Sequence, residues 1–134
     1  MKTKLLLTLI LTFVFGSFQM ITAQSNQQFK LQVNKQKVIT KDKLKITFVS
    51  VLEDSRCPIG VDCIWAGNAK LQLKISQAKG ASKTFELNTN LQPQVFTFEG
   101  YEIKIVDLTP TPKVNVRINR KSYTATVSVS SQAT

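Results

Sequence analysis

The chain has 134 residues, of which 18 are Lys or Arg, 8 are Asp or Glu and none is His, so its net charge is +10 at pH 7. This length suffices for one domain with a single hydrophobic core. The absence of histidine excludes Ser-His and Cys-His nucleophile pairs and histidine-ligated metal centres. We therefore expect no catalytic residues, no metal and no cofactor.

Residues 1–23 have the pattern of a secretory signal peptide. Lys2 and Lys4 precede an apolar run over residues 5–15, and a small-residue cleavage site ends at Ala23. The run is shorter than the roughly 20 residues that span a bilayer, so we do not expect an integral membrane protein. Cleavage near Ala23 would place a chain with 16 basic and 8 acidic residues, net charge +8, in the periplasm or outside the cell.

Alternation of apolar and polar residues predicts strands along most of the remaining chain. Residues 24–28 are polar, and we expect a disordered leader there. The alternating segments after this leader are 29–33, 44–51, 69–75, 85–87, 95–98, 101–108, 114–118 and 123–129. No segment has a convincing helical period.

Local features between these segments predict bends and turns. The alternation changes phase at Phe48-Val49, which predicts a β-bulge. Residues 78–81 predict a turn, and Glu99-Gly100 predicts a tight hairpin. The prolines of Thr109-Pro110-Thr111-Pro112 favour extended backbone, and we expect this segment to carry the chain from one sheet to the other.

Many short strands with regular turn signals predict an all-β domain over residues 29–134. We expect an antiparallel β-sandwich, immunoglobulin-like, of about eight short strands, and a small β-barrel is the alternative. No internal repeat or linker divides this region, so we expect a single domain and a monomer.

The segment 54–67 holds the only two cysteines and the only tryptophan of the chain. Cys57 and Cys63 are separated by five residues, among which Pro58 and Gly60 favour a chain reversal. In an exported protein this pattern predicts a disulfide. A redox pair or a metal site is the alternative, although redox pairs usually have two intervening residues and zinc needs further ligands.

Trp65 follows Cys63 by two residues, so both side chains share a face if a strand has begun there. We expect the indole to pack beside the disulfide in the core. The alternative is a partly exposed ring that recognises a sugar or a peptide.

Glu53, Asp54 and Asp62 form the densest acidic group of this basic chain. Together with loop carbonyls they could bind calcium. Their irregular spacing favours turn capping, or an ion pair with Arg56, over a dedicated calcium loop.

The residues from Asp54 to Gly67 resemble the signature Asp-Ser-Arg-Cys-Pro-x-x-Val-x-Cys-x-Trp-Ala-Gly of a family of exported bacterial β-domain proteins. Residues 101–113 are similar to a strand and proline turn of that family, and residues 123–129 to its closing strand. The resemblance implies a single secreted β domain with a disulfide in the loop. It brings no known activity, so it transfers no catalytic residue.

These features favour a non-catalytic exported binding or accessory domain that presents the disulfide-tied loop. Its candidate binding residues are Arg56, Ile59, Asp62 and Trp65, and its partner would be an unknown protein or glycan of the cell envelope. Rigidity of the loop would reduce the ordering cost of binding. Carboxylate pairs suitable for a hydrolase, Asp54 with Asp62 or Glu99 with Glu102, lie at predicted turns with little room for a cleft.

Two other functions stay open. An inhibitor of an exported hydrolase would insert Arg56 and Pro58 into the enzyme's cleft, which requires Arg56 to project into solvent. An electrostatic binder of anionic envelope polymers would use the lysine cluster Lys35, Lys37, Lys41, Lys43 and Lys45. No aromatic residues interleave with these lysines, so we expect no specific nucleic-acid partner.

Overall fold

The structure is a computed structural model that describes residues 25–39 and 43–132. The predicted signal peptide (residues 1–23) and Lys41 lie outside the described residues. No helix in the described ranges is long and apolar enough to span a bilayer.

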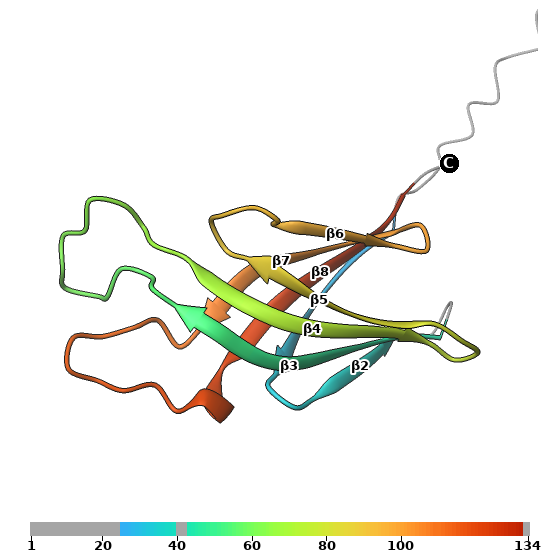
Figure 1. The fold of residues 1–134 in the computed structure, drawn as a ribbon, viewed down its shortest axis with the longest axis horizontal. Coiled ribbons are helices and arrows are strands. Elements are labelled where there is room, and N and C mark those ends of the chain that lie inside the picture. The colour runs from blue at the N-terminus through green and yellow to red at the C-terminus, as the bar shows by residue number, and fades with distance from the viewer. Residues whose placement is uncertain (1–24, 40–42, 133–134) are drawn as a thin grey trace, which may run out of the picture.

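The strands of the described residues form two antiparallel four-stranded sheets that stack as a sandwich (Figure 1). The first sheet has the order β1 (Asn26–Gln32), β8 (Thr124–Ser131), β7 (Tyr101–Thr109) and β6 (Val95–Phe98). The second has the order β2 (Gln36–Ile39), β3 (Leu44–Asp54), β4 (Ala69–Gln77) and β5 (Ser82–Asn88). A 3-10 helix, η1 (Arg120–Ser122), precedes β8. The predicted antiparallel sandwich is confirmed, and the sheets do not close into a barrel.

Each sheet is largely a meander of consecutive strands, β2 to β5 in one and β6 to β8 in the other, with β1 added beside β8. Among the described strands the chain changes sheet between β1 and β2 and again between β5 and β6. An immunoglobulin domain instead places strands distant in sequence side by side within each sheet. The likeness to that fold therefore lies in the sandwich architecture and not in the strand order.

Strand alternation builds the core by turning one apolar face of each sheet inward. Ile46 and Phe48 of β3 are fully buried opposite Ile75 and Leu73 of β4. The outward residues of the same strands are mostly polar or charged.

Phe85 of β5 stacks on Phe96 of β6 with 3.8 Å between ring centroids. The two phenylalanines come from different sheets, so their contact joins the layers near the place where the chain crosses between them.

Two local predictions are confirmed. The pairing of β3 with β4 shifts register between Phe48 and Ser50, as expected for a bulge. Glu99 and Gly100 both have positive φ, 47° and 80°, which is the geometry of a tight two-residue hairpin turn.

Three other predictions are wrong. Residues 26–28 are not a disordered leader, because they pair with β8 through the register Asn26↔Ser130. Residues 114–118 are not a strand, because no neighbouring edge pairs with them beyond the isolated bridge Lys113↔Val116. The proline segment 109–112 does not carry the chain between sheets, because β7 and β8 are neighbours in one sheet.

Candidate functional site at the apolar end

Three loops meet at one end of the sandwich. The disulfide loop (residues 55–68) joins β3 to β4, residues 89–94 join β5 to β6, and residues 110–123 join β7 to β8. Figure 1 shows the first and third at the left of the molecule, reaching past the ends of the sheets. Successive connections in an antiparallel arrangement alternate between the two ends, so the β3–β4, β5–β6 and β7–β8 loops lie together although they are far apart in sequence.

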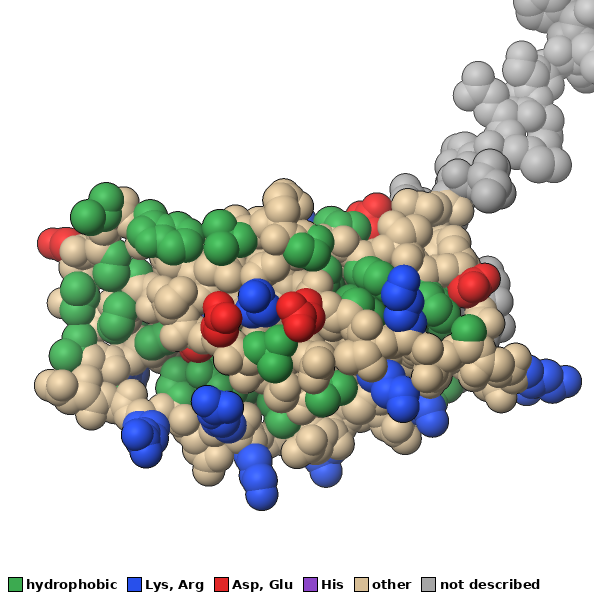
Figure 2. All heavy atoms as spheres, in the orientation of Figure 1, with side chains coloured by type: hydrophobic (Ala, Val, Ile, Leu, Met, Phe, Trp, Pro, Cys, Tyr) green, Lys and Arg blue, Asp and Glu red, His purple; other side chains and the backbone are tan. Residues whose placement is uncertain are grey.

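Exposed apolar side chains concentrate on these loops. Of the eleven large hydrophobic residues exposed in the described chain, seven lie here: Ile59, Val61, Ile64, Trp65, Leu91, Val114 and Val116. Figure 2 shows hydrophobic side chains gathered at this left-hand end. We call these seven residues the apolar end. Apolar residues scattered singly on a surface are ordinary, whereas a concentration of them marks an interaction site.

The predicted disulfide is confirmed. Cys57 and Cys63 are bonded, with 5.9 Å between their Cα atoms. The bond closes a ring that carries Ile59 and Val61, and Ile64 follows immediately after it.

Below the ring, the backbone continues the β3–β4 pairing as a neck. The Ser55 N–H donates to the Asn68 carbonyl at 2.7 Å, and the Cys57 N–H donates to the Ala66 carbonyl at 2.8 Å. These bonds leave the ring little freedom to move relative to the sheet.

Gly67 is required where the two sides of the neck approach most closely. Its φ is +76°, a conformation that other residues rarely adopt. A Cβ at this position would lie 2.7 Å from the Arg56 Cα and 2.8 Å from the Ser55 carbonyl carbon. Only a residue without a side chain fits there.

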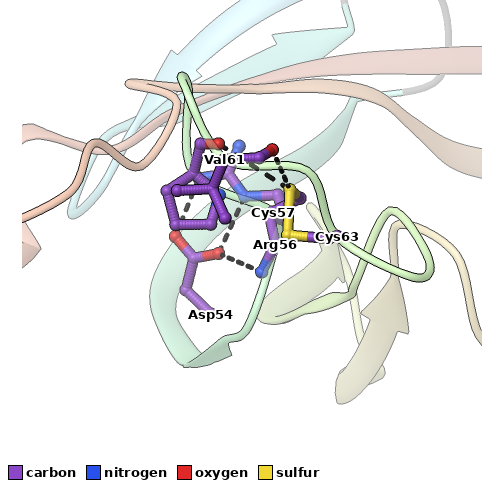
Figure 3. The surroundings of a disulfide bond; sticks show 6 residues. Asp54, Arg56, Cys57, Val61 and Cys63 are labelled. Carbon is purple, nitrogen blue, oxygen red and sulfur yellow. Dashed lines mark hydrogen bonds and ion pairs between the residues drawn. A yellow bond between two sulfur atoms is a disulfide. The ribbon is translucent and has the colours of Figure 1, made fainter.

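Arg56 and Asp54 form an ion pair at the base of the disulfide loop. The Arg56 Nε and Nη2 atoms donate to the two carboxylate oxygens, each at 2.8 Å. The Tyr123 hydroxyl donates to Asp54 Oδ2, also at 2.8 Å. Figure 3 shows this pair beside the Cys57–Cys63 bond. Both charged side chains are largely shielded from water, with 13% of Arg56 and 9% of Asp54 exposed.

The same guanidinium connects the disulfide loop to the opposite sheet. It donates to the Leu108 carbonyl at the end of β7 and to the Pro110 carbonyl at the start of the next loop. The Ile59 N–H donates to the Pro112 carbonyl at 2.9 Å, further along the same segment. The proline segment thus braces the disulfide loop.

The ionisation of this cluster follows from its surroundings. Burial acts to raise the pKa of Asp54, but hydrogen bonds from Arg56 and Tyr123 outweigh it and hold the pKa below its usual value. Burial acts to lower the pKa of Arg56, and the Asp54 carboxylate raises it overall. For Tyr123, burial and the bond to Asp54 together raise the pKa to about 12. The ion pair is therefore charged at neutral pH.

Two buried asparagines hold the loop of residues 89–94. The Asn68 Nδ2 atom donates to Asn88 Oδ1 at 2.9 Å, and Asn68 Oδ1 accepts from the N–H groups of Asn90 and Leu91. The Asn90 side chain donates in turn to the Gly67 carbonyl. Leu91 is thereby placed beside the base of the disulfide loop.

Three of the four candidate binding residues are exposed together on the disulfide loop, namely Ile59, Asp62 and Trp65. The expectation that Trp65 packs in the core is wrong, because 54% of the residue is exposed and β4 begins only at Ala69. Arg56 is not presented to solvent, so an inhibitor that inserts this side chain into a cleft is not compatible with this structure.

Two of the three acidic residues form ion pairs, and the third, Asp62, is exposed. Asp54 forms the predicted pair with Arg56, and Glu53 approaches Lys70 at 3.8 Å. Within residues 25–39 and 43–132, no group of three or more Asp, Glu, Cys or His side chains could hold a metal ion.

Sequence reasoning missed the contributions of the other two loops, in particular Leu91, Val114 and Val116. It also missed the bracing residues Asn68 and Tyr123. The alternation of Val114 and Val116 was visible in the sequence but was interpreted as strand.

No protein-family model matches the chain, and searches of curated proteins and of solved structures found no similar protein.

Proposed function

We propose that this protein is a non-catalytic binding domain of the cell envelope and that the apolar end contacts its ligand. Residues 1–23 would be removed during export. The observation that carries the proposal is the concentration of exposed apolar side chains on three loops that are braced from beneath. A surface held in place before binding loses little conformational freedom when the ligand arrives.

The bracing groups supply that rigidity. The disulfide closes the outer ring, the Asp54–Arg56 pair fixes its base, and Asn68 fixes the adjacent loop. These bonds use backbone carbonyls and buried polar groups, and they leave the exposed side chains free for contact.

We also propose that the chain belongs to the family whose signature it resembles. The bracing contacts give that signature a physical reason at Asp54, Arg56 and Gly67. Val61 and Trp65 also occupy signature positions, yet both are exposed, 43% and 54% respectively. Their exposure supports a role in ligand contact for these two signature residues.

Photo-crosslinking in intact cells tests the proposed binding surface. A photoreactive phenylalanine analogue replaces Ile64, which is fully exposed, or Val106, an exposed aliphatic residue of β7 outside the three loops. We expect covalent adducts with an envelope component from position 64 and none from position 106. Absence of adducts at position 64, or equal yields at both positions, would contradict the proposal.

A further inference from the structure

Positive charge lies directly beside the apolar end. Lys113, Arg117, Arg120 and Lys121, in the loop between β7 and β8, are all exposed. None of them has an ion-pair partner among the described residues. The three loops contain one further basic residue, Arg56, which Asp54 neutralises, and a single acidic residue, Asp62.

The turn between β1 and β2 extends this positive surface. The Val33 N–H donates to the Tyr123 carbonyl at 3.0 Å, and the Gln32 side chain donates to the Lys121 carbonyl at 3.1 Å. These bonds place the turn against the end of the β7–β8 loop, and the exposed Lys35 follows within it. We call Lys35, Lys113, Arg117, Arg120 and Lys121 the basic flank.

The apolar and basic surfaces adjoin. Arg120 lines a depression of about 300 Å³ together with Val116 and Ile118, and the carboxylates of Glu53 and Asp54 line it too. Figure 2 shows basic side chains along the lower edge of the molecule, continuing to the apolar left-hand end.

An anionic bilayer presents the two chemistries that match this arrangement. Its interface accepts apolar side chains and favours tryptophan, whose ring is amphipathic. Its phosphate head groups attract lysine and arginine near the surface. Apart from Val116, which borders that depression, the apolar residues stand on protruding loops, so they can enter an interface together without exposing the core. The exposed Asp62 and Glu53 act against this attraction, but the basic flank outnumbers them.

We infer that the ligand of the apolar end is an anionic phospholipid surface, into which the loop tips insert Trp65 and its aliphatic neighbours while the basic flank binds the head groups. This inference rests on the proposed function and names its ligand class. The protein would lie on the bilayer as a peripheral domain, with binding that combines apolar burial and electrostatic attraction.

The fluorescence of Trp65 measures insertion of the loop tips directly, because Trp65 is the only tryptophan of the chain. The protein recovered from the cell envelope is mixed with vesicles of phosphatidylglycerol or of phosphatidylcholine. We expect a blue shift of the tryptophan emission, and quenching by brominated acyl chains, with phosphatidylglycerol only. Added salt should weaken the binding because it screens the head-group attraction.

Substitutions separate the two contributions. We expect Ile64→Ser to weaken vesicle binding about tenfold, and Arg117→Gln with Lys121→Gln to weaken it roughly 30-fold. Asp62→Asn should strengthen it. The matched controls are Val106→Ser and the pair Lys79→Gln with Lys104→Gln, which alter exposed residues outside the three loops and should leave binding unchanged.

Each other outcome overturns the inference. Vesicle binding with unchanged Trp65 emission would show attachment elsewhere in the chain. Equal losses of vesicle binding from Arg117→Gln with Lys121→Gln and from the control pair Lys79→Gln with Lys104→Gln would show a non-specific charge effect. Absence of vesicle binding together with crosslinking at position 64 would show that the ligand is a protein or glycan, and the proposed function would stand. Absence of both would reject the proposed function as well.

Discussion

The Arg56 guanidinium donates a 2.8 Å hydrogen bond to the carbonyl of Pro110, which lies 54 positions further along the chain. Arg56 follows β3 in one sheet, and Pro110 follows β7 in the other. The contact therefore links the two sheets at the end of the sandwich that carries the three loops. It also fixes the angle at which the disulfide loop leaves the domain.

Arg56→Ala should reduce the free energy of unfolding by about 3 kcal/mol, because it leaves the buried Asp54 carboxylate without its charged partner. Urea denaturation measures this loss. Lys70→Ala is the matched control, since Lys70 pairs with Glu53 at 3.8 Å in a partly exposed position and should cost under about 0.5 kcal/mol. Similar losses in the two variants would contradict the bracing role of Arg56.

Gly67→Ala should destabilise the domain more than Gly60→Ala. Both glycines have positive φ, +76° and +86°, so both variants incur the left-handed penalty of about 1–2 kcal/mol. A Cβ at position 67 also overlaps the backbone of residues 55 and 56, whereas at position 60 nothing lies within 4 Å. Denaturation midpoints compare the two, and equal midpoints would show that the neck can widen.

The stability of the domain should fall between pH 10 and pH 12 because of Tyr123. Its pKa is raised from 10.0 to about 12 in the folded protein. The phenol therefore loses its proton at a lower pH in the unfolded chain than in the folded protein. The contribution of Tyr123 to the free energy of unfolding is complete below pH 10 and is lost as the pH rises through the folded-state pKa. In Tyr123→Phe this decline is absent, so the stability gap between variant and parent narrows above pH 10.

Absorbance of tyrosinate provides an independent check, since the chain has two tyrosines. The titration step of the folded protein near pH 12 should disappear in Tyr123→Phe. If it persists, the high-pKa group is not Tyr123.

Replacing both cysteines, Cys57→Ser with Cys63→Ser, should cost about 2.4 kcal/mol and leave the sandwich folded. This magnitude is the chain-entropy effect expected for so small a ring. Neither cysteine belongs to the hydrophobic core, so the sheets keep their packing. Circular dichroism and denaturation measure both effects, and the reduced parent protein is the control. An unfolded double variant would mean that the loop organises the whole domain.

Export should leave a chain that begins at Gln24 and has no free thiol. Intact-mass analysis of the protein recovered outside the cytoplasm measures both features, because alkylation should add mass only after reduction. Retention of residues 1–23, or ready alkylation of the native protein, would contradict export through a cleaved signal peptide.

Parts of the fold were predictable because their signals are local. The alternation over residues 69–75 and 101–108 matches β4 and β7, whose inward residues are buried. The short β2 was missed because four residues carry too little periodicity. Residues 114–118 alternate as a strand would, but a strand also needs a partner edge, and the fold offers none there.

The candidate site was predictable only in part. Ile59 and Asp62 are exposed as a binding loop requires. Arg56 was also expected to be presented, but it turns inward because Asp54 and two carbonyls satisfy its donors. Trp65 was expected in the core, and it is exposed because the chain at that point is still loop.

The sequence by itself determined most of the strands, the bulge at Phe48, the hairpin at Glu99-Gly100 and the pairing of Cys57 with Cys63, since each depends on residues close together in the chain. Only the tertiary structure decided that Val114 and Leu91 join Trp65 at one end, and that Arg56 is structural. Those outcomes depend on which strands pair and on which buried groups need partners. Such constraints act across the whole chain and are not encoded in any short segment.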